Sequence, residues 1–206
     1  MTGWYLIRAL GFVSLLAFTG SITLGLASTV GARTPAGADA RLIRQLTHRS
    51  LAVLGLIALA GHMVLTVLDS YVDVPLTATI LPFGSGYRPL AIAVGVIALY
   101  AFVVTAVSGW SRGRFAQSPA AARVWRVIHS CAYLGWAASI YHGFTAGTDT
   151  HTWWAMATYA VCTAAVGIAL VIRGIAARDT RYTSNRLVIP SADYADQSHQ
   201  PQEVGR

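Results

Sequence analysis

Two pairs of histidines lie inside long apolar runs of this chain. His48 and His62 are 14 residues apart in HRSLAVLGLIALAGH, and His129 and His142 are 13 residues apart in HSCAYLGWAASIYH. An ionisable side chain within a membrane helix is costly and is usually functional. An α-helix rises 1.5 Å per residue, so each pair spans about 20 Å of a hydrocarbon core about 30 Å thick. The spacing predicts two levels of imidazoles within a membrane.

The composition is that of a membrane protein. Of the 206 residues, 55% are hydrophobic and 11% are charged, whereas a soluble domain carries about 25% charged residues. We therefore expect an all-α, polytopic membrane helical bundle with the lipid bilayer as its environment. The 15 basic residues are all arginines, and so few positions argue against a nucleic acid as partner.

Five apolar runs are expected to be transmembrane helices. They extend over Trp4 to Gly31, His48 to Leu68, Pro89 to Trp110, Val124 to Thr145 and Thr152 to Ile172. The apolar region of a secretory signal is about 7–15 residues long, so the longer first run is interpreted as a retained helix. Pro35 and Gly37 predict a short basic loop over residues 32–47. Residues 1–174 are expected to form the bundle, and residues 175–206 a polar, disordered cytoplasmic tail.

The arginines predict the orientation of the bundle, because cytoplasmic loops retain positive charge. Four lie in the connection that ends at Arg49, four in the connection from Arg112 to Arg126, and five from Arg173 onwards. The N-terminus is then outside and the C-terminus cytoplasmic. Arg8 disagrees mildly with this count, and we expect it to snorkel to the outer interface.

This topology predicts which histidines share a level. One helix separates the two histidine-bearing helices, so these two run parallel. His48 and His129 then lie on the cytoplasmic side, and His62 and His142 on the outer side. A 13-residue step misses its starting helix face by about 140°. We therefore expect a bend or a π-bulge in the fourth helix, near Gly135, or an offset between the levels.

Two imidazoles at one depth on facing helices can hold a haem iron axially, so two levels predict two haems. Arg49 follows one inner histidine directly, and Arg126 precedes the other by three residues. Both are candidates for charge-assisted hydrogen bonds to haem propionates. They are explained nearly as well as ordinary residues of a positively charged cytoplasmic side.

The chain resembles the ferric reductase-like transmembrane domain family, which includes ferric reductases, NADPH oxidases and the haem subunit of the periplasmic methionine sulfoxide reductase system. The resemblance covers residues 40–172 and rests on the histidine spacings and on HGFTAGTD, from His142 to Asp149. It implies two b-type haems, ligated by His48 with His129 and by His62 with His142, in a bacterial cytoplasmic membrane. The family commonly has six helices, and many members add FAD and NADPH domains. This chain has five expected helices and a tail too polar for a FAD or NAD(P) site.

The expected function is transmembrane electron transfer. A separate flavoprotein or a quinol would reduce the inner haem, and the outer haem would reduce an external redox protein, a ferric chelate or oxygen. The chain would be the electron-transfer subunit of an oxidoreductase, and no catalytic residue is assigned. Two alternatives remain open. A haem-free transporter or assembly subunit would use the histidines for a proton or metal path, and a quinol-linked cytochrome b anchor subunit would keep the haems.

Overall fold

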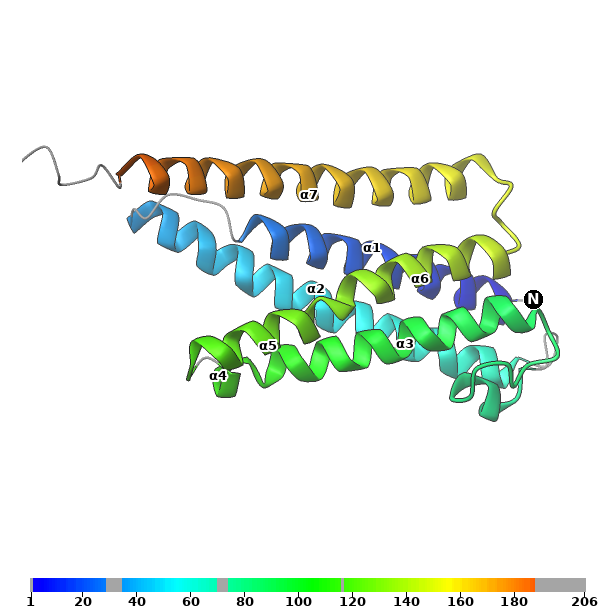
Figure 1. Cartoon of the computed structure of the whole chain (residues 1–206). Coiled ribbons are helices and arrows are strands. Elements are labelled where there is room, and N and C mark those ends of the chain that lie inside the picture. The colour runs from blue at the N-terminus through cyan, green and yellow to red at the C-terminus, as the bar shows by residue number, and fades with distance from the viewer. Residues whose placement is uncertain (1, 29–34, 70–73, 116, 188–206) are drawn as a thin grey trace, which may run out of the picture.

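The computed structural model describes residues 2–28, 35–69, 74–115 and 117–187. In these ranges every regular element is a helix, as expected for an all-α protein. The elements are α1 (Thr2–Ala27), α2 (Pro35–Leu68), the 3₁₀ helix η1 (Leu76–Thr79), α3 (Pro89–Trp110), α4 (Arg112–Phe115), α5 (Pro119–His129), α6 (Cys131–Ala146) and α7 (Trp153–Leu187). Figure 1 shows the long helices lying side by side along one direction.

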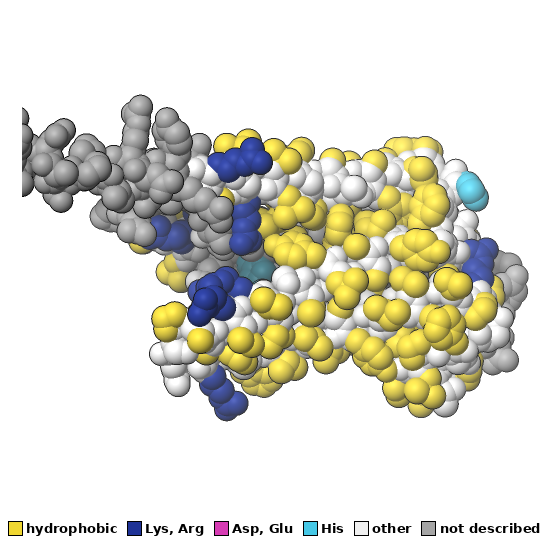
Figure 2. Space-filling view, in the orientation of Figure 1, with side chains coloured by type: hydrophobic (Ala, Val, Ile, Leu, Met, Phe, Trp, Pro, Cys, Tyr) yellow, Lys and Arg dark blue, Asp and Glu magenta, His cyan; other side chains and the backbone are white. Residues whose placement is uncertain are grey.

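Four of the described helices are long and apolar enough to cross a membrane. The candidate spans are Gly3–Ala27, Gly37–Leu68, Pro89–Trp110 and Trp153–Arg178. Large apolar side chains cover the outside of the bundle (Figure 2), as at Ile57, Val107 and Val171, which are 60–65% exposed. A soluble monomer rarely exposes so wide an apolar surface. These helices indicate a multi-pass membrane protein.

The fourth expected span consists of two helices, α5 and α6, which meet at Ser130. The backbone N–H of Ser130 donates to the carbonyl of Val127 (3.1 Å), and that of Tyr133 donates to the carbonyl of Ser130 (3.0 Å). These are 3₁₀-type bonds, which give about 3.0 residues per turn and a rise of about 2.0 Å per residue. The extra rotation and length let a 13-residue step approach a 14-residue one. The expectation of a π-bulge near Gly135 was wrong, because Gly135 lies inside regular helix α6.

Two expected boundaries also differ. Residues 35–47, expected as a loop, form the first turns of α2, because proline at the first helical position loses no hydrogen bond. Helix α7 continues to Leu187, so it includes residues 175–187 of the expected tail. Residues 188–206, and Arg33 of the basic connection, lie outside the described residues.

The packing leaves α2 and α5–α6 separated by the other helices. Helix α2 packs mainly on α1, α6 packs mainly on α3, and α7 lies along α1 (Figure 1). Within the described ranges, α2 makes no comparable contact with α5 or α6. Helices α2 and α5–α6 run in the same direction (Figure 1), which is the arrangement predicted from one intervening span.

An aromatic pair closes the middle of the bundle. The rings of Phe18 on α1 and Phe102 on α3 stack with centres 3.8 Å apart and planes 14° apart. A Cβ atom at Gly55 would come within 2.8 Å of the Phe18 ring, and one at Gly135 within 3.2 Å of the Phe102 ring. The four helices therefore meet closely at this height because two of them carry glycine there.

Candidate functional site

The structure brings the four histidines together in two pairs. The ring centres of His48 and His129 are 6.3 Å apart, with ring planes at 60°. Those of His62 and His142 are 6.4 Å apart, with ring planes at 85°. These are the partners expected from parallel α2 and α5–α6. The 13-residue and 14-residue spacings thus lead to two levels of nearly equal separation.

Each histidine is held through its Nδ1 atom by a neighbouring helix. Nδ1 of His48, His62 and His142 lies 2.7 Å, 2.8 Å and 2.7 Å from a backbone carbonyl oxygen. These carbonyls belong to Ser21, Ile7 and Ala91, in that order. A carbonyl only accepts hydrogen bonds, so Nδ1 carries the proton and Nε2 keeps a free lone pair.

Nδ1 of His129 lies 2.9 Å from the hydroxyl oxygen of Ser108. The Ser108 hydroxyl also lies 2.8 Å from the carbonyl oxygen of Thr105, to which it can donate its own proton. The hydroxyl oxygen is then free to accept a proton from His129. The fourth imidazole therefore has the same available tautomer as the other three.

Four glycines make these contacts possible, and the sequence analysis did not find them. A Cβ atom would lie 3.4 Å from the His62 ring if placed at Gly11 and 3.3 Å from the His48 ring if placed at Gly25. On α3, a Cβ atom at Gly95 would lie 2.7 Å from the His142 ring, and one at Gly109 would lie 3.4 Å from the His129 ring. The supporting helices thus lack side chains where the imidazoles approach.

The glycines repeat with the same period as the histidines. Gly11 and Gly25 are 14 residues apart, as are Gly95 and Gly109. Phe18 and Phe102 lie midway within their pairs, so α1 and α3 both read glycine, phenylalanine, glycine at steps of seven residues. This spacing is a signal in the sequence, but its meaning depends on which helices are neighbours.

The ring separation fits two imidazoles that share one metal ion. A histidine nitrogen lies about 2 Å from a bound metal and its ring centre roughly 1 Å further back, so rings on opposite sides have centres about 6 Å apart. The described residues contain no cluster of three or more histidine, cysteine, aspartate or glutamate side chains that could hold a metal. Two imidazoles per level suit an axially ligated porphyrin iron better than an ion bound by protein side chains alone.

A cavity surrounds the outer pair. It holds about 1490 Å³ of free space, part of it open to the outside, and its walls come from the four helices α1, α2, α3 and α6. Among its lining residues are both outer histidines and both outer glycines. Most of the remaining lining is apolar, including Leu15, Phe18 and Leu59. A flat apolar ligand between the imidazoles would lose contact with water.

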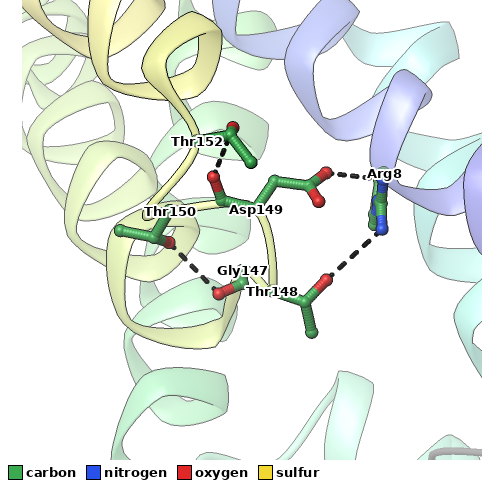
Figure 3. A network of polar contacts seen from close by, with 6 residues as sticks. All are labelled: Arg8, Gly147, Thr148, Asp149, Thr150 and Thr152. Carbon is green, nitrogen blue, oxygen red and sulfur yellow. Dashed lines mark hydrogen bonds and ion pairs between the residues drawn. The ribbon is translucent and has the colours of Figure 1, made fainter.

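Polar side chains lie at the outer end of this cavity (Figure 3). Nη2 of Arg8 lies 2.7 Å from Oδ2 of Asp149, and Nη1 of Arg8 lies 3.5 Å from the hydroxyl oxygen of Thr148. The hydroxyls of Thr150 and Thr152 donate to backbone carbonyls of the same loop. Arg8 thus makes an ion pair with the α6–α7 loop, which differs from the expectation that it extends to the interface alone.

The two arginines expected near the inner histidines are exposed. Arg49 lies on α2 and Arg126 on α5. Beside His129 the structure instead has Trp125, stacked on the imidazole at 5.0 Å, with Arg112 5.3 Å from the Trp125 ring centre. Arg112 is one helical turn beyond Gly109 on α3. Its proximity depends on tertiary packing that adjacency in the sequence does not reveal.

Comparison with protein-family models, curated proteins and solved structures finds no match for this chain. Its function is therefore argued from the geometry of its own residues.

Proposed function

We propose that this chain carries electrons across a membrane through two b-type haems. The observation that supports this most is the pair of histidine levels, with ring centres 6.3 Å and 6.4 Å apart and Nδ1 atoms engaged by neighbouring helices. His48 and His129 are the proposed ligands of one haem, and His62 and His142 of the other. The proposal agrees with the resemblance to the ferric reductase-like transmembrane domain family.

The proposed topology has five spans, with α5 and α6 together forming the fourth. Arginine side chains gather at the end of the bundle where α2 begins and α7 ends (Figure 2). Because cytoplasmic segments retain positive charge, this end is proposed to face the cytoplasm of a bacterium. The N-terminus is then outside, and the His48 and His129 level is the inner one. Arg49 and Arg126, exposed at this end, remain candidates for contact with propionates of the inner haem.

The chain's residues hold and insulate the redox groups. When bound, haem supplies one-electron chemistry between ferric and ferrous iron. Two histidines per iron leave no open coordination position, so oxygen does not bind the metal directly. The carbonyls that accept from Nδ1 fix the tautomer and the orientation of each ring. Phe18 and Phe102 fill the space between the two levels and exclude water from it.

The proposed direction of transfer is outward. With the inside of the cell negative, moving one electron across the full field is assisted by about 2.3 kcal/mol per 100 mV. A separate flavoprotein or a quinol is the proposed donor, and an external redox protein, a ferric chelate or oxygen the proposed acceptor. The chain then acts as the membrane subunit of an oxidoreductase.

The decisive test is the absorption spectrum of the purified protein. Dithionite-reduced minus air-oxidised spectra should show b-type bands, and the pyridine haemochrome assay should give two haems per chain. Colourless, iron-free protein would overturn the proposal and favour a transporter or assembly subunit. Reduction by a quinol analogue without any flavoprotein would favour the quinol-linked anchor subunit.

A further inference from the structure

Arg8 is a cationic side chain within the first turns of an apolar span. It lies three residues before Gly11 and therefore on the same face of α1, one turn nearer the outer end. Its side chain is 25% exposed and lines the cavity that contains His62 and His142. A guanidinium in a membrane helix is costly, so its position calls for a function.

The contacts of Arg8 leave one of its donors free. A guanidinium has five N–H donors. The Nη atoms face Asp149 and Thr148 (Figure 3), whereas the buried Nε atom has no hydrogen-bond partner among the described residues. Leaving a buried donor unsatisfied costs about 1–3 kcal/mol. Asp149 therefore orients Arg8 without satisfying the Nε edge of its guanidinium.

We propose that Arg8 binds a propionate carboxylate of the porphyrin held between His62 and His142. This inference rests on the function proposed above. In a mainly apolar cavity, the propionates are the charged part of that ligand and must reach a polar end. Arg8 lies at the outer end, and a carboxylate accepts charge-assisted hydrogen bonds from a guanidinium. The ion pair with Asp149 holds the side chain in place for this contact.

The experiment compares two substitutions with two porphyrins. Arg8→Gln removes the cation, and Arg88→Gln is the matched control. Arg88 is an exposed outer arginine that donates to the carbonyl of Thr145 and does not line the cavity. Each full-length protein is loaded either with protohaem or with its dimethyl ester, whose propionates cannot ionise. Release to apomyoglobin is followed, and the phase missing in His62→Ala is assigned to the outer level.

We expect Arg8→Gln to release outer protohaem at least about tenfold faster than wild type, as for loss of a charge-assisted hydrogen bond. Arg88→Gln should match wild type. Wild type loaded with the ester should release it faster to a similar degree, and Arg8→Gln should then add no further change. This last comparison does not depend on how well the variant folds.

Three results would overturn the inference. Equal outer release from Arg8→Gln and wild type would show that Arg8 does not retain the haem. An equal effect of Arg8→Gln on protohaem and ester would assign Arg8 a structural role only. A wild-type protein that takes up neither porphyrin would refute the proposed function itself, which is a different failure from the first two.

Discussion

The imidazole of His142 rests on Gly95, where a Cβ atom would come within 2.7 Å of the ring nitrogen Nδ1. The same nitrogen lies 2.7 Å from the carbonyl oxygen of Ala91, one turn earlier on α3. The approach that makes this hydrogen bond is therefore open only to a residue without a side chain. Helix α3 orients a side chain of α6 through its bare backbone.

Gly95→Ala is expected to displace His142 and to remove the outer haem while the inner haem stays bound. The added methyl group would overlap the ring, and the ring cannot move without losing its bond to Ala91. Haem per chain, measured by pyridine haemochrome, should fall from two towards one. Gly167→Ala is the control, because a Cβ atom there meets nothing within 4 Å. Equal haem content in the two variants would contradict this role of Gly95.

His62→Ala is expected to abolish the outer haem and to leave part of the inner haem bound. The two levels use different ligands, and an iron with one remaining imidazole is held weakly. His151→Ala serves as the control, since this histidine is exposed in the α6–α7 loop. If His62→Ala keeps both haems, the assignment of ligands is wrong.

Ser108→Ala is expected to raise the reduction potential of the inner haem. The serine oxygen, 2.9 Å from Nδ1 of His129, increases the basicity of the imidazole when it accepts that proton. A more basic ligand favours ferric iron, so its loss favours ferrous iron. Redox titration of the α-band should show the inner component shifted upwards. Ser111→Ala, one turn further along α3, should leave both components in place, and an unchanged inner potential in Ser108→Ala would refute the effect.

Gly55→Ala is expected to destabilise the bundle by about 1–3 kcal/mol, as for overpacking of a tight core. Its Cβ atom would lie 2.8 Å from Cε1 of Phe18. Adding Phe18→Leu should recover part of the loss, because the shorter side chain makes room. Thermal unfolding in detergent measures both variants against Gly174→Ala, where a Cβ atom meets nothing within 4 Å. A Gly55→Ala protein as stable as this control would show that the centre of the bundle is loosely packed.

Several elements were predictable from local patterns. Helix α3 begins at Pro89 and ends at Trp110 as expected, because a proline at the first position and an aromatic residue at the other end mark both boundaries. The histidine spacings likewise sufficed to propose two levels. Pro35 was misinterpreted because proline interrupts a helix but also favours its first turn, and only the structure shows which applies.

The contacts around the histidines could not be derived from local patterns. A glycine in an apolar run, such as Gly25, is compatible with many packing arrangements, and its meaning depends on which helix lies opposite. Arg8 and Asp149 are separated by almost the whole bundle in sequence, so no periodicity connects them. The break at Ser130 depends on the hydrogen bonds of one turn, which the 13-residue spacing required but did not locate.

The two-turn repeat shared by α1 and α3 constrains chain length more than residue type. Inserting one residue between Gly11 and Gly25 would rotate one of them by about 100° and shift it by about 1.5 Å relative to the other. One imidazole would then meet a side chain in place of bare backbone. Substitutions on the lipid-facing surface leave this register intact, so such a protein should tolerate changes of side chain there far better than any insertion or deletion within these helices.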